Sequence, residues 1–95
     1  MAIYVMFGTY SSEALRDVSS KRTDEATAVI KRHGGELKAV YALLGEVDLV
    51  VIVDLPDIEH AMQTSVALNK LLGISFRTAP AVSIETFDKL MSGVG

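Results

Sequence analysis

The feature that most constrains the fold is the segment at residues 45–56, which reads GEVDLVVIVDLP. A Gly-Glu pair is followed by a run of apolar, mostly β-branched residues, and a proline closes the run. Such a run between turn residues predicts a strand that is buried on both faces. Asp48 nevertheless stands at the start of this strand, where an unpaired buried carboxylate would be costly. The fold therefore has to explain the position of Asp48.

The rest of the chain divides into strands and helices by the same criteria. Strands are expected at residues 2–9, 36–44, 47–54 and 74–82, and helices at residues 20–33 and 57–72. Glycines at 34–35 and at 73 are expected to end the two helices, because glycine is favoured just beyond a helix C-terminus. The Gly45-Glu46 pair is expected to form a two-residue hairpin turn between the second and third strands.

Two shorter helical segments are expected beside these elements. Ser11 or Ser12 can cap a helical turn that continues through Leu15 and Val18. A short terminal helix is also expected, with Ser83 or Thr86 as its cap. Its apolar residues are expected to pack back onto the body: Phe87, Leu90 and Met91.

The order of the predicted elements is β-α-β-β-α-β, which is the ferredoxin-like pattern of an α+β fold. Right-handed crossovers place the first and third strands in the centre of the sheet and both helices on one face. The first and third strands are also the two that are apolar throughout, so polarity and topology agree. A chain of 95 residues supports one core, so residues 1–95 are expected to form a single domain.

Pairing across the predicted hairpin assigns residues to the two faces of the sheet. Tyr41 pairs with Val50 and Leu43 with Asp48, because the turn sets the register. The face assigned to the helices is apolar: Val40, Ala42, Leu44, Val47, Leu49, Val51 and Val53. The opposite, open face carries Ala39, Tyr41, Leu43, Asp48, Val50 and Ile52. The first and fourth strands are expected to add Tyr4, Met6, Ser75 and Arg77 to the open face, with Ile3, Val5, Phe7, Ile74 and Phe76 directed toward the helices.

The open face is too apolar to remain in water, since Val50 and Ile52 lie on it beside Asp48. A second copy of the sheet packed against it would bury these residues. We therefore expect a homodimer, or a higher homo-oligomer, that forms through this face and encloses a cavity between two sheets as in a dimeric α/β barrel.

Four polar residues of the open face are candidates for binding a small ligand: Tyr4, Tyr41, Asp48 and Arg77. Arginine binds anionic or carbonyl groups, a carboxylate accepts a hydrogen bond or a proton, and phenols orient polar ligands. Each candidate also has a structural interpretation. Asp48 and Arg77 can form an ion pair between subunits, or Asp48 can accept hydrogen bonds at the hairpin, and the tyrosines can fill a dimer interface.

Composition narrows the classes of partner and cofactor. The net charge of −3 argues against a nucleic-acid binder. The chain has no cysteine, and its two histidines have no partner at a metal-binding spacing, so no metal and no other cofactor is expected. The longest apolar run is far shorter than the roughly 20 residues of a membrane span. The N-terminus lacks the features of a signal peptide, so a cytoplasmic protein without a membrane partner is expected.

The chain resembles the GYD domain family, which is named after a Gly-Tyr-Asp pattern at this hairpin. The matching stretches are GEVDLVVIVDLP at 45–56, YV in the first strand, SSKR at 19–22, GG at 34–35 and RT at 77–78. Val47 replaces the tyrosine of the family pattern, and its assignment to the helix side implies altered packing rather than an altered site. The resemblance implies a ferredoxin-like fold and a dimer, similar to α/β-barrel monooxygenases and to ligand-binding domains of Lrp/AsnC-type regulators. It implies no particular activity.

Three classes of function remain from the sequence. The first interpretation is a non-enzymatic module that binds a small ligand or a partner. The alternative is a cofactor-free enzyme, such as a monooxygenase or an isomerase, that uses a pocket on the open face. The third class is a structural protein that forms oligomers. The four candidate residues are a thin catalytic set, which favours the first class.

Overall fold

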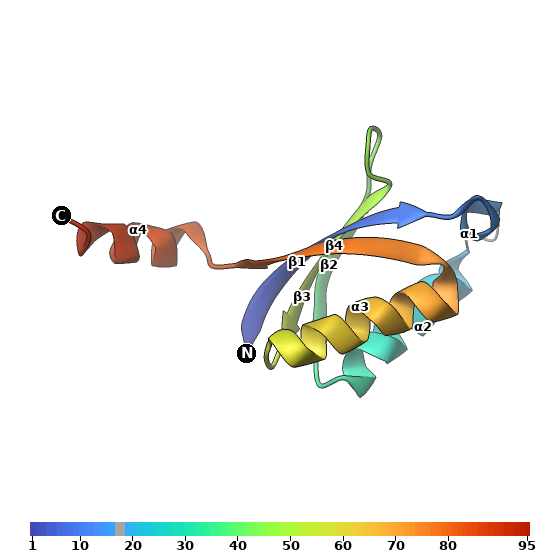
Figure 1. Cartoon of the computed structure of the whole chain (residues 1–95), viewed down its shortest axis with the longest axis horizontal. Coiled ribbons are helices and arrows are strands. Elements are labelled where there is room, and N and C mark those ends of the chain that lie inside the picture. The colour runs from blue at the N-terminus through green and yellow to red at the C-terminus, as the bar shows by residue number, and fades with distance from the viewer. Residues whose placement is uncertain (17–18) are drawn as a thin grey trace.

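A computed structural model describes residues 1–16 and 19–95 of the chain. The elements are β1 (Ala2–Tyr10), α1 (Ser12–Arg16), α2 (Ser20–Arg32), β2 (Glu36–Ala42), β3 (Leu49–Leu55), α3 (Ile58–Leu72), β4 (Ile74–Ala81) and α4 (Ile84–Ser92). The strands form an antiparallel sheet in the order β2-β3-β1-β4, and α2 and α3 lie together on one face of it (Figure 1). The predicted α+β fold of ferredoxin-like order is therefore confirmed. Val18, which was expected in the first helical turn, lies outside the described residues.

Local signals set the ends of the two helices that cover the sheet. Asp57 caps α3, because its carboxylate accepts a hydrogen bond of 2.9 Å from the backbone N–H of His60. Gly73 ends α3 in the left-handed region, with a φ of 70°, where glycine meets no steric penalty. Gly34 follows α2 with a φ of 80°. These ends match the predicted glycine stops.

The core lies between the sheet and the two covering helices. Alternate residues of β3 are buried, from Leu49 to Leu55, as expected for a strand that presents one face to a core. They pack with Met6 of β1, Ile30 of α2 and Leu68 of α3. The helix-side assignment of β3 is therefore confirmed.

The predicted assignment of β1 to the two faces is wrong. Residues opposite each other in an antiparallel pair share a face, and Tyr4 lies opposite Val53 while Met6 lies opposite Val51. Tyr4 is only 4% exposed and Met6 is fully buried, so both belong to the helix side. Ile3, Val5 and Phe7 take the open face instead. Because β1 is apolar at almost every position, its sequence does not show which alternate residues face the core.

The β2–β3 hairpin is longer than predicted. The backbone N–H of Leu43 donates to the carbonyl oxygen of Asp48 at 2.8 Å, and Tyr41 lies opposite Val50, so the predicted pairing is confirmed. Residues 44–47, however, form a projecting loop in place of a two-residue turn (Figure 1). Val47 is half-buried in this loop, so its predicted place in the helix-side core is wrong. Other residues assigned to the helix side are exposed near this end of β2: Val40, Ala42 and Leu44.

The C-terminal helix also differs from the prediction. α4 projects away from the body beyond the end of β4 (Figure 1), and none of its residues is buried. Phe87, Leu90 and Met91 therefore do not pack back onto the chain that carries them. Sequence periodicity predicts the helix itself, but it does not show which surface the helix contacts.

Candidate functional site

One row of side chains crosses the whole open face of the sheet. Arg77 of β4 lies opposite Phe7 of β1. Phe7 in turn lies opposite Val50, and Val50 lies opposite Tyr41 of β2. Neighbouring strands are about 4.8 Å apart, so three spacings, roughly 14 Å, separate Tyr41 from Arg77. Two predicted ligand residues thus lie at opposite edges of one face, and a single chain does not bring them together.

The other two predicted ligand residues support the fold. Tyr4 lies in the core on the helix side. The Asp48 carboxylate accepts a hydrogen bond of 2.8 Å from the backbone N–H of Tyr10, and the backbone N–H of Asp48 donates to the carbonyl oxygen of Gly8 at 2.8 Å. Asp48 therefore ends the pairing between β1 and β3. Among the roles predicted for Asp48, that of a hydrogen-bond acceptor at the hairpin is closest to the observed one, although the donor belongs to β1.

Arg77 borders a hollow of about 330 Å³ on the open face, beside the hairpin loop. The other lining residues are Phe7, Leu43, Leu44, Gly45, Glu46 and Val47. Val47, which stands at the position of the tyrosine in the GYD pattern, thus lies near Arg77. The departure from that pattern changes the surface of this hollow rather than the helix-side core.

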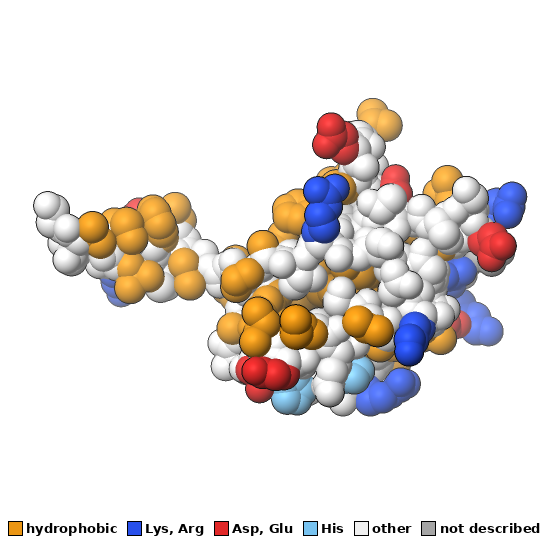
Figure 2. All heavy atoms as spheres, viewed as in Figure 1, with side chains coloured by type: hydrophobic (Ala, Val, Ile, Leu, Met, Phe, Trp, Pro, Cys, Tyr) orange, Lys and Arg blue, Asp and Glu red, His pale blue; other side chains and the backbone are white. Residues whose placement is uncertain are grey.

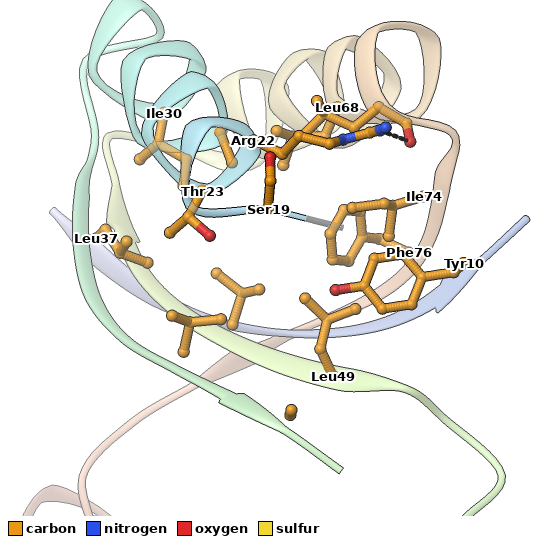
Figure 3. A pocket seen from close by; sticks show the side chains of 15 residues that line it. Tyr10, Ser19, Arg22, Thr23, Ile30, Leu37, Leu49, Leu68, Ile74 and Phe76 are labelled. Carbon is orange, nitrogen blue, oxygen red and sulfur yellow. Dashed lines mark hydrogen bonds between the residues drawn. The ribbon is translucent and has the colours of Figure 1, made fainter. Parts of the chain in front are cut away.

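A cavity of about 250 Å³ lies on the other side of the sheet, between the sheet and the helices α2 and α3 (Figure 3). We refer to it as the helix-side cavity. Its wall is mainly apolar and draws on both helices and on all four strands. The principal apolar residues are Ile30, Leu37, Leu49, Leu68, Ile74 and Phe76. An apolar hollow with a few polar groups is the usual form of a small-molecule site.

The polar groups of the helix-side cavity come from β1 and from the start of α2. Figure 3 shows the hydroxyl groups of Tyr10 and Thr23 directed into the space. The guanidinium group of Arg22 donates a hydrogen bond to the backbone carbonyl of Leu72. That carbonyl belongs to the last turn of α3, where backbone acceptors have no partner within the helix, so the contact ties α2 to α3 at the edge of the cavity. The cavity therefore has hydrogen-bonding groups within a mainly apolar wall.

Sequence reasoning missed the helix-side cavity and the role of Tyr10 in it. A signal was present in the small residues Thr23, Ala26 and Ala42, which line the cavity. Larger side chains at these places would fill the space, since protein interiors are closely packed. The sequence alone does not distinguish a small residue that admits a close neighbour from one that leaves a hollow.

One ionisable group outside the cavity has a shifted pKa. The backbone N–H and then the imidazole of His60 hydrogen-bond to the Asp57 carboxylate, and they hold the pKa of Asp57 below its ordinary value. This pair caps the start of α3, so its role is structural. Among residues 1–16 and 19–95, no group of three or more acidic, histidine or cysteine side chains could hold a metal ion. In the same residues, no helix has the length and apolar character to cross a membrane.

The GYD domain family matches residues 4–91, which is nearly the whole chain. The chain belongs to the GYD domain family. No curated protein matches it significantly. The family assignment and the observed fold agree with the resemblance inferred from the hairpin sequence.

Among solved structures, this GYD domain is similar to the leucine response regulatory protein LrpA of Mycobacterium tuberculosis. The TM-score is 0.58 at 13% sequence identity, and the match covers 86% of this chain. The GYD domain spans about half of that protein, since the match covers 51% of the LrpA chain. At this level of identity the likeness establishes the shared fold and no more.

Proposed function

We propose that this GYD domain is a non-enzymatic homodimeric module that binds a small ligand in the helix-side cavity of each copy. The open faces of the two sheets would pack together. The single observation that carries the ligand site is the helix-side cavity, because it combines an apolar wall with inward hydroxyl groups from Tyr10 and Thr23. Hydroxyl groups of this kind fix the orientation of a ligand, because each can donate and accept a hydrogen bond.

The chemistry of the cavity supports a small, mostly apolar ligand with one or two polar atoms. Its volume of about 250 Å³ is just below the usual range of roughly 300–1,000 Å³ for ligand pockets. An aromatic ring or a short aliphatic chain with a carboxylate, amide or ring N–H suits this space. Arg22, at the edge, would contribute positive charge near such a group.

The composition of the open face supports the dimer. Val5, Phe7, Val50 and Ile52 lie together on the two central strands, and α2 and α3 leave this side of the sheet uncovered. Apolar groups of this extent favour association, because burial removes them from water. The similar fold in a leucine response regulatory protein is compatible with a binding role. A cytoplasmic location stays a prediction.

A thermal-shift experiment with indole, benzoate and hexanoate tests the ligand site. At least one probe should stabilise the protein, and a ligand at 100 times its Kd adds about 2.7 kcal/mol. Ala26→Leu should abolish the stabilisation by filling the cavity. Ala28→Leu, the same change on an exposed part of α2, is the matched control and should leave the stabilisation intact.

Arg77→Ala separates this proposal from the ligand site predicted on the open face. Stabilisation that persists in Arg77→Ala and disappears in Ala26→Leu supports the helix-side cavity. The reverse pattern would place the ligand on the open face and overturn the proposed site. Sedimentation equilibrium tests the dimer separately, since a species of 10.2 kDa at micromolar concentration would contradict it.

A further inference from the structure

α4 has one apolar side and one polar side, and both are exposed. Ile84, Phe87, Leu90 and Met91 recur at helical spacing and form the apolar side. Glu85, Asp88, Lys89 and Ser92 occupy the other side. Figure 2 shows the apolar side chains gathered on this helix, clear of the body. An apolar stripe of this kind is typical of a helix that packs against another surface.

A helix of this length needs such a surface in order to persist. α4 has nine residues, whereas isolated helices shorter than about 12–15 residues are marginal in water. Ser83 caps the helix by accepting a hydrogen bond of 3.1 Å from the backbone N–H of Thr86. A cap supports the first turn but does not bury the apolar side. Packing of this apolar side against another surface therefore has to supply the remaining stability.

The outer surface of α3 has a groove of matching character. Ile58, Met62 and Val66 recur every four residues and are 53%, 66% and 55% exposed. They border a hollow of about 330 Å³ between α3 and β4, which Tyr4, Phe76, Thr78 and Pro80 also line. We call this hollow the α3 groove. Figure 2 shows apolar side chains in a row along this helix.

The apolar stripe of α4 fits the α3 groove in length. From Ile58 to Val66 the helix rises about 12 Å, and from Ile84 to Met91 about 10 Å, at 1.5 Å per residue. Spacings of four on α3 and of three and four on α4 allow the side chains of each helix to pack between those of the other. Without this contact, the apolar side of α4 and the α3 groove would both remain exposed to water.

We propose that α4 of one copy docks in the α3 groove of a second copy, which returns its own α4 in the same way. Val82 and Ser83 are the only residues between β4 and α4, and Ser83 is extended, so α4 continues outward from the strand (Figure 1). Short hinges favour exchange of an element between copies over folding back. Phe76 lines both the α3 groove and the helix-side cavity, but the exchange requires neither a ligand in that cavity nor packing of the open faces.

Disulfide trapping between different chains tests this exchange, because the protein has no cysteine of its own. One chain carries Met62→Cys, and a second chain, lengthened by an affinity tag, carries Leu90→Cys. After the two are mixed under mild denaturant, refolded and oxidised, a non-reducing gel should show a cross-linked product of both chains. Lys89→Cys in place of Leu90→Cys is the matched control, since Lys89 lies on the polar side of α4. The control should give at least about tenfold less product, because docking raises the effective concentration only at the apolar side.

A chain with both Met62→Cys and Leu90→Cys distinguishes exchange from folding back. If its disulfide forms within one chain and the mixed chains give no joint product, α4 occupies its own groove and the proposal is overturned. The proposal also fails if Leu90→Cys gives no more product than Lys89→Cys. A joint product that depends on position 90 supports the exchange.

Discussion

Asp48 is explained by a single hydrogen bond to the neighbouring strand. β3 begins at Leu49, whereas β1 continues to Tyr10, so the N–H of Tyr10 lies beyond the paired part of β3. The Asp48 carboxylate accepts that N–H and prevents it from remaining unpaired. The sequence showed a carboxylate at the start of an apolar strand, but its donor lies 38 residues away along the chain. Only the observed sheet identifies that donor.

Replacement of Asp48 by alanine is expected to destabilise the protein by about 1–2 kcal/mol, because the N–H of Tyr10 loses its partner in a partly buried place. Asp48→Asn retains an acceptor oxygen and should cost less. Urea unfolding at one fixed protein concentration measures both changes, since association contributes to apparent stability. Equal midpoints for wild type and Asp48→Ala would show that this hydrogen bond contributes nothing.

The face of the sheet on which Tyr4 lies could not be predicted from the sequence of β1. Its predicted role depended on which side of β1 faces the helices, and almost every residue of that strand is suitable for either side. The hairpin register could be predicted for β2 and β3, because a turn connects them directly. β1 has no such connection to its neighbours β3 and β4 in the sheet, so its register depends on packing between distant elements.

At the scale of elements, prediction succeeded where local chemistry and chain topology agreed. The glycine stops of α2 and α3 and the strand order could be derived, because helix ends and crossover handedness follow general rules. The helix-side cavity could not be derived from the sequence, since it depends on the position of α2 over the sheet. That position results from packing at several residues together, among them the small residues Thr23 and Ala26.

The turn from α2 into β2 depends on close packing at Gly35. A Cβ atom there would lie 2.5 Å from Cδ2 of Leu55 and 2.7 Å from the backbone oxygen of Asp54, so β2 or β3 would have to move. Gly35→Ala is therefore expected to cost about 1–3 kcal/mol, as overpacking usually does. Chemical denaturation measures this cost.

Gly8→Ala is the matched comparison for Gly35→Ala. A Cβ at Gly8 would meet only side chains, at 2.7 Å from Leu49 and from Phe76. Both of these residues line the helix-side cavity and have space into which they can shift. Gly8→Ala should thus be the milder change, and a larger loss at Gly8 than at Gly35 would contradict the packing inferred for the two sites.

At the scale of the whole molecule, some apolar surfaces are left uncovered by a single chain. Local sequence does not show what covers them. The open face and α4 are both apolar and exposed, and the sequence predicted a partner for the first but a contact within the chain for the second. Periodicity identifies an apolar side equally well in both cases. It does not state whether the same chain or another copy covers that side, because this depends on the direction in which β4 leaves the body.

A charge in the centre of the open face should dissociate a dimer that forms through it. Ile52 of β3 lies opposite Val5 and Ala39, so its side chain is surrounded by apolar neighbours on the two adjacent strands. In Ile52→Asp each copy would bury an unpaired carboxylate on association, at a cost of roughly 2–4 kcal/mol and therefore a loss of about 30-fold or more in affinity. Each separate copy should keep its fold, because this face then contacts water.

Ala28→Asp introduces the same charge on an exposed part of α2 and is the control. Sedimentation equilibrium and circular dichroism together decide the matter: a folded Ile52→Asp protein that associates as strongly as Ala28→Asp would exclude the open face as the interface.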